Sequence, residues 1–445
     1  MKVWEYDVVV IGGGPAGYYC ALQCSKGGLK VALAEKEELG GTGLRWGCLP
    51  VKKILDDCKV LNRLKIGADD LYRGLLSKRI GSYKEEMVIV EEKMKEKLLE
   101  AKVDLYFGEG AFLDQYTYQV EENVLKTTYM VIATGTSPCG FEGFEVDGET
   151  IVAHKEVVNF TSLPETIIII GGNVEGCEFA SLFAEFGVKV ILVEKQQEIL
   201  QGNDKDLVEP LEMYLESLDV EIYKGLGAKT IQYHQDNKIT IVLDDNRELE
   251  TEKVLVTGGR KPNFPTGIED LGIHLEKDRI IVDTDLKTNV PNIYGIGDIN
   301  GILGMAHVAI QQGIAVADHI IFKNKVTMQY KELPRAIFTI PEIAGVGYQE
   351  FELLEAGISY KKGICKLSDT WRGFSKGITE GFVKVLVGEN DKLLGIWMVG
   401  DDVSEYVGLM GILIEKEITV KEIKSNLMVH PSLTESILEA ILNVE

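Results

Sequence analysis

The sequence predicts an α/β protein with two dinucleotide-binding units and a C-terminal α+β region. Three observations lead to this fold class. A glycine-rich turn joins a short apolar strand to a helix near the N-terminus, and a second copy of this arrangement begins 159 positions later. From about Thr327 onward the pattern changes to short strands followed by helices. A chain of 445 residues has room for roughly two to four domains.

The first unit starts with the β-branched run Asp7–Ile11, which is typical of a buried parallel strand. The turn of residues 12–17 follows, then a helix to about Lys26 and a second strand, Lys30–Ala34. The turn has the pattern G-x-G-x-x-G. Its place between a strand and a helix is the context that a dinucleotide fingerprint requires.

Each member of this fingerprint has a physical role. Gly12 makes the tight turn, Gly14 lets the backbone approach a pyrophosphate, and Gly17 lets the helix pack on the strand. The N–H groups at the helix N-terminus attract phosphate. Glu35, at the end of the second strand, can accept a hydrogen bond from a ribose hydroxyl. We therefore expect a Rossmann-like dinucleotide-binding unit here.

The second unit repeats the first without gaps after the strand Thr166–Ile170. Gly171, Gly176 and Glu194 stand where the first unit has its first glycine, its third glycine and its acid. Two such units in one chain indicate two dinucleotides, or a flavin and a nicotinamide. Glu194 suits the 2′-hydroxyl of NAD better than the 2′-phosphate of NADP.

Two residues of the second unit depart from the pattern. Asn173 replaces the middle glycine and adds a side chain where a pyrophosphate should press on the backbone. Glu175 places a carboxylate in the same turn, where it should repel an anion. Nicotinamide binding is the favoured interpretation, and a unit kept only for packing is the alternative.

Six further segments carry motifs that lie outside the two fingerprints. They are GGTGLRWGCLPVK at 40–52, YMVIATG at 129–135, VLVTGGRKPN at 254–263, NIYGIGD at 292–298, RAIFTIPE at 335–342 and LMVHPSLTE at 427–435. In this order the chain resembles the flavin-dependent disulfide reductases of the dihydrolipoamide dehydrogenase and glutathione reductase family. The resemblance covers essentially the whole chain.

This resemblance implies FAD in the first unit, NAD(H) in the second, and a C-terminal α+β dimerisation domain. The NAD unit is then inserted into the FAD unit, which gives four segments: FAD-binding 1–147, NAD-binding 148–262, FAD-binding continued 263–326, and interface 327–445. Beyond the fingerprint residues, it implies cofactor contacts from Gly41, Thr42, Thr134, Gly135, Gly259, Arg260 and Asp298. By the same resemblance Asp298 binds the ribityl chain.

The resemblance also implies the reacting groups. Cys48 corresponds to the thiolate beside the flavin, and its glycine-rich turn at a helix start favours that state. Lys52 and Glu178 match an ion pair near flavin N5. His430 and Glu435 match an acid–base dyad, for which imidazole is suited because it titrates near neutral pH. In the family this dyad serves the other subunit, so a homodimer is expected.

Gly43 is the main departure, because the family carries the first of its two cysteines at this position. The two-thiol relay is therefore impossible in this chain. Arg45 and Trp46 place a cation and a large aromatic ring beside Cys48, which predicts a changed specificity surface.

Three functions remain open. The first is a one-cysteine oxidoreductase that acts on a small-molecule or lipoyl-like thiol, disulfide or other sulfur substrate. The second is a flavin electron carrier whose acceptor is a quinone, dioxygen or a protein partner. The third is a non-catalytic interaction subunit. The presence of Cys48, Lys52, His430 and Glu435 favours the first, whereas the irregular second phosphate turn favours the others.

Composition limits the partners and the compartment. A net charge of −23 argues against nucleic acid and anionic membranes as partners. Seven scattered cysteines without a C-x-x-C motif are typical of a reducing compartment. The first strand begins by Asp7, which leaves no room for a signal peptide, and no apolar run approaches the ~20 residues that span a bilayer. We therefore expect a cytoplasmic protein.

Overall fold

The structure of the chain is a computed structural model that describes residues 1–63, 70–234, 238–326, 328, 330 and 332–445. The chain forms two compact units. The first contains Met1–Val51, Ser77–Ser162 and Gly258–Met328, and the second contains Lys52–Leu76, Leu163–Thr257 and Gln329–Glu445. Two of the boundaries fall inside helices α3 (Cys48–Arg63) and α4 (Asp70–Glu100).

The first unit is built on a seven-stranded sheet whose central strands are parallel. Its order is β3-β2-β1-β6-β5-β4, and β21 also pairs with β6. The strands are β1 (Lys2–Ile11), β2 (Val31–Glu35), β3 (Asp104–Phe107), β4 (Gly110–Asp114), β5 (Thr117–Val120), β6 (Asn123–Ile132) and β21 (Ile293–Gly295). Strands β4 and β5 pair antiparallel, as do β5 and β6.

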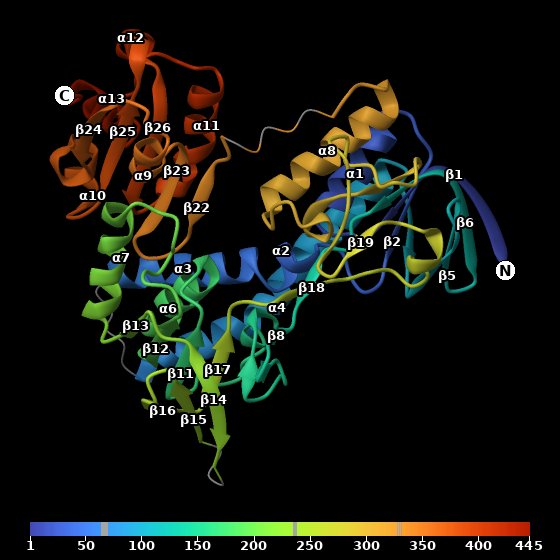
Figure 1. Ribbon diagram of the computed structural model, residues 1–445, viewed down its shortest axis with the longest axis horizontal. Helices are drawn as coiled ribbons and strands as arrows, with labels where there is room; N and C mark the ends of the chain where they lie inside the picture. The colour runs from blue at the N-terminus through green and yellow to red at the C-terminus, as the bar shows by residue number, and fades with distance from the viewer. Residues whose placement is uncertain (64–69, 235–237, 327, 329, 331) are drawn as a thin grey trace. The chain divides into compact units, whose positions relative to one another are not determined.

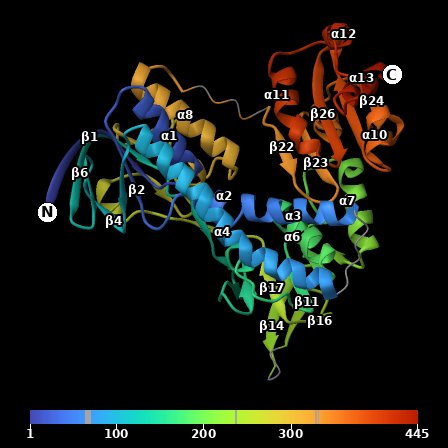
Figure 2. The same cartoon turned by 180° about the vertical axis from the view of Figure 1, so that it is seen from behind.

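Apolar side chains cover both faces of this sheet. On one face α1 (Pro15–Lys26) and α8 (Ala306–Phe322) lie side by side, and their buried residues share a core with alternate residues of β1 and β2 (Figures 1 and 2). The other alternate residues of β1, β2 and β6 form a second core with loop residues such as Ile268 and Ile273. A parallel sheet buried on both faces explains the continuous apolar runs in the sequence.

The second unit contains a parallel sheet whose strands run in the order β17-β11-β12-β13. These are β11 (Thr166–Ile170), β12 (Lys189–Glu194), β13 (Glu221–Lys224) and β17 (Lys253–Val256). Its helices are α6 (Val174–Glu185) and α7 (Lys205–Ser217). An antiparallel sheet follows, made of β14 (Ala228–Tyr233), β15 (Ile239–Leu243) and β16 (Glu248–Thr251).

The C-terminal part of the second unit is an antiparallel sheet in the order β22-β23-β26-β25-β24, packed against helices. The strands are β22 (Arg335–Ile337), β23 (Glu342–Gly347), β24 (Lys361–Lys366), β25 (Phe382–Val387) and β26 (Leu393–Gly400). The helices are α9 (Glu350–Glu355), α10 (Trp371–Lys376), α11 (Val407–Glu415), α12 (Val420–Ser425) and α13 (Glu435–Leu442). Buried residues of α11, α12 and α13 share one core with the sheet.

The remaining elements are short. They are α2 (Gly41–Arg45), β7 (Thr136–Pro138), β8 (Gly140–Phe141), β9 (Phe144–Glu145), β10 (Ile151–Val152), α5 (His154–Val157), β18 (Arg260–Pro262), β19 (Leu275–Glu276), β20 (Arg279–Ile280) and the 3₁₀ turns Glu269–Leu271, Gly297–Asn300, Leu367–Asp369, Glu389–Asp391 and Val403–Tyr406. No helix in the described ranges is long and apolar enough to cross a bilayer.

Both predicted strand–turn–helix units are present, and the fold class is confirmed. The differences lie where apolar patterning is weak. Strand β1 begins at Lys2 rather than Asp7, because its first residues pair with β6 although they are exposed. The helical pattern of the sequence predicts helices over about 50–64 and 84–101. Helix α4 begins at Asp70, ahead of the predicted start, and Gly74 and Gly81 weaken the helical signal there. Residue 64, the predicted end of α3, lies outside the described residues.

The C-terminal region also differs in detail from its prediction. The sequence pattern predicts a strand over Arg335–Ile340 and helices over 402–416 and 431–443. The strand ends at Ile337, and a second strand, β23, begins at Glu342. The first of these helices starts with a 3₁₀ turn, and the second begins only at Glu435. The Glu435 carboxylate accepts a hydrogen bond from the Ser432 N–H, which holds the preceding residues in a turn.

Candidate active site

The first glycine-rich turn has the geometry that its sequence requires. Gly12 has φ +105°, a conformation that favours glycine. A Cβ on Gly17 would lie 1.9 Å from the Gly12 carbonyl oxygen, so only glycine allows α1 to pack here. The Glu35 carboxylate accepts a hydrogen bond of 2.6 Å from the Gly13 N–H and one of 3.1 Å from the Glu37 N–H. The acid therefore holds its own turn closed.

This turn and α2 contact each other at Gly14 and Gly41, and their bare backbones form a cradle without side chains. A Cβ built on Gly14 meets only the Gly41 Cα, at 3.9 Å, and a Cβ built on Gly41 would lie 3.0 Å from the Gly14 Cα. Gly41 has φ +53°, and Thr42 follows it in α2. Two bare backbone segments that face each other suit the close approach of a pyrophosphate.

The turn after β6 supplies polar groups to the same unit. The Thr134 hydroxyl is buried and has no hydrogen-bond partner among the described residues. Asn263 fixes the turn, because its Nδ2 donates to the Thr134 carbonyl at 3.0 Å and its N–H donates to the Gly135 carbonyl at 3.0 Å. A Cβ on Gly135 would meet no atom within 4 Å. An orphaned hydroxyl beside an open turn is what a bound cofactor would satisfy.

Asp298 lies in the 3₁₀ turn Gly297–Asn300. Burial raises the pKa of its carboxyl group, against the opposing influence of Arg260 and of a 3.4 Å hydrogen bond from the Thr136 hydroxyl. Arg260 donates through Nε to the Thr136 hydroxyl at 2.8 Å. Gly259 packs so closely that a Cβ there would lie 1.8 Å from the Gly140 carbonyl oxygen. Asp298 thus offers a partly buried acceptor for a hydroxylated ligand.

The second turn copies the first in its backbone and its acid. Gly171 has φ +109°, and a Cβ on Gly176 would lie 1.8 Å from the Gly171 carbonyl oxygen. The Glu194 carboxylate accepts hydrogen bonds of 2.6 Å from the Gly172 N–H and 2.6 Å from the Gln196 N–H. The internal repeat therefore extends to individual hydrogen bonds.

Asn173 does not project toward the phosphate position as its place in the pattern suggested. Its Oδ1 accepts a 3.0 Å hydrogen bond from the Gly176 N–H at the start of α6, and its Nδ2 donates to the Thr257 carbonyl. The side chain is therefore an N-cap. Its Oδ1 occupies an N–H group that would otherwise be available to a phosphate. Asn173 therefore differs from the glycine of the fingerprint through its hydrogen bond rather than through the size of its side chain.

Cys48 is the first residue of α3 and is exposed. The Trp46 and Gly47 N–H groups both donate to the Thr42 carbonyl, at 3.1 and 2.7 Å, which ends α2 and fixes the turn before α3. None of the seven cysteines forms a disulfide. A thiol at the start of a 16-residue helix lies in the field that favours its thiolate form.

The surroundings of Trp46 correct one prediction. Arg45 was expected to place a cation on the surface beside the thiol, but its guanidinium pairs with Glu38 and, at 3.1 Å, with Glu91. The Trp46 ring lies between two cations, with the Arg45 Cζ 5.1 Å and the Lys155 Nζ 4.8 Å from its centroid. The charge of Arg45 is thus neutralised locally, and Trp46 is held in place.

Lys52 follows one helical turn after the thiol in α3. Its Nζ lies 2.5 Å from the Glu178 Oε2 and 4.9 Å from the centroid of the Phe338 ring. Glu178 is nearly buried, with its side chain 7% exposed, and its Oε1 accepts a 3.0 Å hydrogen bond from the Phe338 N–H. The structure thus brings together the two residues expected to form an ion pair.

The predicted dyad also forms a hydrogen bond. The His430 Nδ1 lies 2.9 Å from the Glu435 Oε1, and the Glu435 Oε2 accepts from the Ser432 N–H at 2.8 Å. These two hydrogen bonds, from Ser432 first and His430 second, lower the pKa of Glu435. An ionised carboxylate only accepts, so Nδ1 carries the proton and Nε2 is the basic nitrogen of the neutral ring.

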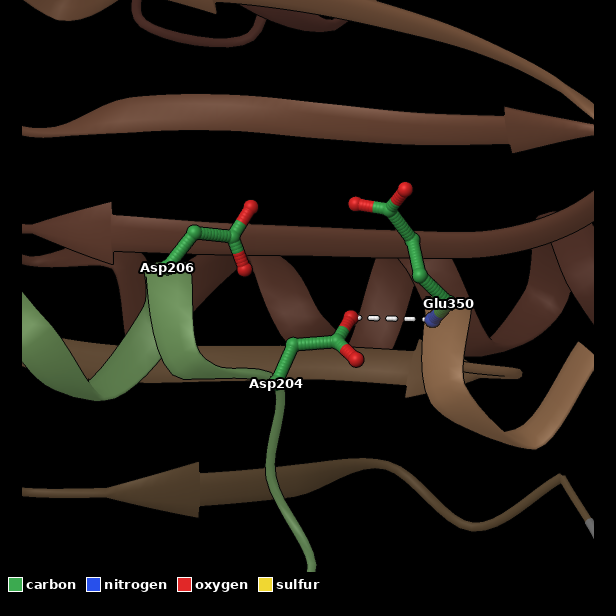
Figure 3. Close-up of side chains that lie close together, drawn as sticks. All are labelled: Asp204, Asp206 and Glu350. Carbon is green, nitrogen blue, oxygen red and sulfur yellow. Dashed lines mark hydrogen bonds between the residues drawn. The ribbon is translucent and has the colours of Figure 1, made fainter. Parts of the chain in front are cut away.

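A buried charge cluster was not predicted from the sequence. The carboxylates of Asp204, Asp206 and Glu350 converge in Figure 3, with their oxygens within 4.8 Å of one another. The Lys384 ammonium, fully buried, lies 2.8, 2.7 and 3.2 Å from them and so offsets part of their negative charge. Hydrogen bonds to Lys384 hold the pKa of Asp204 below its ordinary value although burial alone would raise it.

These observations define a class of protein. The chain repeats a glycine-rich turn that is hydrogen-bonded to its own acid, and a thiol begins α3, which follows the first of these two strand–turn–helix units, as in two-dinucleotide oxidoreductases. The chain belongs to the pyridine nucleotide-disulphide oxidoreductase family, whose family model matches residues 6–313. The model of the family's dimerisation domain matches residues 333–441. Members are FAD-dependent NAD(P)H oxidoreductases that act on sulfur groups.

Relatives and solved structures agree with this assignment. A dihydrolipoyl dehydrogenase of Bacillus subtilis is 31% identical, and the alignment covers 98% of each chain. The crystal structure of LpdA from Mycobacterium tuberculosis superposes with a TM-score of 0.90 at 25% identity and covers 99% of both chains. The flavoprotein disulfide reductase RclA from Escherichia coli gives a TM-score of 0.88 at 25% identity and covers 99% of this chain and all of its own.

The residues of the first unit fit FAD. Gly14 and Gly41 leave the cradle that a pyrophosphate needs, and Thr134 has an unsatisfied buried hydroxyl. The second unit fits NAD(H) in its turn and its acid, but the Asn173 side chain occupies the Gly176 N–H. The cap itself is local and of a kind that asparagine commonly forms at a helix start, whereas the hydrogen bond from Asn173 to Thr257, far along the chain, left no pattern in the sequence.

Proposed function

We propose that this protein is a homodimeric, dihydrolipoyl dehydrogenase-like oxidoreductase that moves electrons between NAD(H) and a sulfur substrate through Cys48 alone. The observation that carries this proposal is the hydrogen bond of 2.9 Å between His430 and Glu435. A flavin electron carrier has no need for an oriented acid–base group. Sulfur chemistry needs one, because each thiolate that is released must be protonated.

The proposal assigns the cofactors to the two units. FAD is held by the first turn, Glu35, Gly41, Thr42, Thr134 and Asp298, and its chemistry when bound is to exchange two electrons with NAD(H) and with sulfur. NADH is held by Gly171, Gly176 and Glu194, and Glu194 favours NADH over NADPH. The four segments with boundaries at 147, 262 and 326 belong to the same proposal.

In the reducing direction, the Cys48 thiolate attacks one sulfur of a disulfide substrate. A sulfur–sulfur bond to Cys48 forms, the substrate bond breaks, and the released thiolate takes a proton from the imidazolium of His430. Two electrons from NADH then cleave this mixed disulfide, which restores the Cys48 thiolate and releases the second half of the substrate as a thiolate. That thiolate takes a second proton through His430, so that one disulfide, NADH and one proton give two thiols and NAD⁺. Glu435 orients the His430 ring throughout, since it accepts from Nδ1. We propose that His430 of one subunit serves Cys48 of the other.

Gly43 supports a second candidate, a flavin electron carrier that uses a quinone, dioxygen or a protein acceptor. A Cβ on Gly43 would meet only the Pro15 Cγ, at 3.4 Å, so no side chain of the described residues fills the place of the first thiol. Without that thiol, disulfide exchange depends on direct access of the substrate to Cys48, which is exposed.

The deciding experiment compares Cys48→Ser with Cys139→Ser, a control at a partly buried thiol of the same unit. Both variants should bind FAD and accept electrons from NADH in stopped-flow measurements. Only Cys48→Ser should lose NADH-dependent reduction of lipoamide and the long-wavelength thiolate–flavin absorption of the reduced protein. Lipoamide turnover that survives Cys48→Ser would exclude the one-cysteine mechanism and favour the electron carrier.

Subunit mixing tests the homodimer. Random dimers of Cys48→Ser and His430→Gln chains place both lesions in one site of each hybrid and none in the other. About a quarter of all sites should then be intact, although each parent is inactive. No recovery in verified hybrids would show that each site uses one chain.

A further inference from the structure

An exposed tryptophan contacts the candidate acid–base group. The Trp371 ring lies edge-on to the His430 imidazole, with their centroids 5.0 Å apart and their planes at 69°. The two residues are far apart in the sequence, and both belong to the second unit. Trp371 remains 75% exposed in spite of this contact. Most of the indole surface beside His430 is therefore not covered by this chain itself.

The helix that carries this ring is fixed by its own residues. Thr370 caps α10, because its hydroxyl accepts from the Gly373 N–H at 2.9 Å and donates to the Leu367 carbonyl at 2.8 Å. A Cβ on Gly373 would lie 1.8 Å from the Leu367 carbonyl oxygen, so this close turn depends on glycine. At the other end, the Lys376 Nζ lies 2.8 Å from the Asp402 carboxylate. Trp371 is thus presented from a firmly anchored turn.

A second aromatic ring lies on the same side of α10. Phe374 follows Trp371 by three residues, a spacing that places both side chains on one face of a helix, and it is 85% exposed. Neither ring contributes to the core that joins the C-terminal helices to their sheet. A pair of exposed aromatic rings beside a polar reacting group is typical of a binding surface rather than of a packing element.

We propose that Trp371 is a specificity-determining residue for the sulfur substrate, and that Phe374 extends the surface it forms. The indole contacts the organic body of the substrate while its sulfur lies next to His430. This surface selects a thiol or disulfide carried on an apolar chain or ring over one carried on a small hydrophilic body. The inference rests on the proposed sulfur chemistry and adds the chemical class of its substrate.

The test uses full-length holoenzyme with Trp371→Ala and Trp371→Phe. Leu354→Ala is the control, since Leu354 is a 69% exposed apolar residue on α9 of the same unit. NADH-dependent turnover is measured with lipoamide, an apolar-chain disulfide, and with hydroxyethyl disulfide, a small hydrophilic one. Trp371→Ala should raise KM for lipoamide about 2- to 12-fold, the usual worth of one aromatic contact, with kcat nearly unchanged. Trp371→Phe should raise KM for lipoamide less than Trp371→Ala does, because phenylalanine keeps part of the aromatic contact.

The two probes separate a specificity role from a structural one. KM for hydroxyethyl disulfide should stay unchanged in every variant, and Leu354→Ala should behave as the parent with both substrates. Equal changes for both disulfides, a loss confined to kcat, or dissociation of Trp371→Ala into monomers in sedimentation would overturn the inference.

A binding measurement separates this inference from the function on which it rests. Lipoamide should quench tryptophan fluorescence in the parent and in Cys48→Ser, and much less in Trp371→Phe. If turnover survives Cys48→Ser, the proposed function fails, whereas the quenching still reports on Trp371. If quenching is the same with and without Trp371, the specificity role is excluded even where Cys48 proves essential.

Discussion

Restoring a second thiol is the most direct test of how this chain handles sulfur. In Gly43→Cys the new side chain would sit in α2, five residues before Cys48. Gly43 does not have a positive φ, and its added Cβ would make one ordinary contact of 3.4 Å with the Pro15 Cγ. Cysteine is also slightly better than glycine in a helix, so we expect a stability change of only about 0.3 kcal/mol.

The geometry for a disulfide between the added thiol and Cys48 is less favourable than the fit of the added side chain itself. No atom of Cys48 lies within 4 Å of the Cβ built on Gly43. Disulfides place their Cβ atoms about 3.5–4.5 Å apart. The bond can therefore form only near the long end of this range, or after a small closing movement of the turn between α2 and α3. We expect it to form under oxidising conditions and to be readily reduced.

The expected gain in activity follows from the chemistry. Loss of the exchanging thiol should cost ~10³-fold in lipoamide turnover, because covalent relay is replaced by direct access to Cys48. Gly43→Cys should recover at least ~30-fold of this loss, allowing for the imperfect geometry. The assay is steady-state NADH-dependent reduction of lipoamide. Titration of free thiols before and after NADH is added measures how much disulfide has formed and how much of it is reduced.

Gly43→Ser is the matched control, since it adds a side chain of similar size without redox chemistry. It should leave turnover at the parent level. Equal gains in the serine and cysteine variants would mean that the side chain acts by shape. A disulfide that forms and is reduced by NADH without any gain in turnover would show that the missing thiol is not what limits this protein.

Four further outcomes are expected. Asn173→Gly should speed reduction of the flavin by NADH about 3- to 10-fold in stopped flow, because it releases the Gly176 N–H for phosphate at a cost of a few tenths of a kcal/mol; an unchanged rate would contradict this. Lys384→Met should lower the free energy of unfolding by about 3 kcal/mol in urea titrations, since it leaves the buried Asp204 carboxylate without its cation; a neutral result would refute the role of the cluster. The pKa of Asp204 is lower in the folded protein than the value of about 3.9 expected in the unfolded chain. The resulting stabilisation is present above the unfolded pKa and is lost as the pH falls through the folded pKa. The midpoint temperature of unfolding should therefore fall more steeply between pH 5 and 3 in the parent than in Lys384→Met. Glu435→Gln should lower lipoamide turnover ~10²-fold and leave flavin reduction by NADH unchanged, because an amide can donate to Nδ1 and favour the wrong imidazole tautomer; unchanged turnover would remove Glu435 from the mechanism.

Sequence reasoning succeeded where local structure fixes the spacing of residues. The glycines of both turns and their acids lie at distances set by one strand, one helix and the next strand. The same holds for His430 and Glu435, which are five positions apart and hydrogen-bonded. The two turns and their acids could therefore be found from spacing, whereas the dyad was found through the family resemblance of its segment.

Contacts between distant segments left no such pattern. Lys384 pairs with Asp204, 180 positions away, and the Asn173 side chain bonds to Thr257, 84 positions away. The approach of Trp371 to His430 likewise depends on how two separate segments pack. These pairings follow from tertiary packing, which periodicity and spacing do not encode.

The carboxylates of Glu35 and Glu194 have one further consequence. Each accepts a 2.6 Å hydrogen bond from an N–H group inside its own glycine-rich turn, that of Gly13 or Gly172. The conformational entropy of these loops is therefore lost when the chain folds, and not when a nucleotide arrives. Such preorganised loops favour rapid reconstitution of the apoprotein. A substitution at either acid therefore changes the conformation of the loop in the unliganded protein as well as the contact with ribose. Its effect on nucleotide affinity is the sum of these two changes.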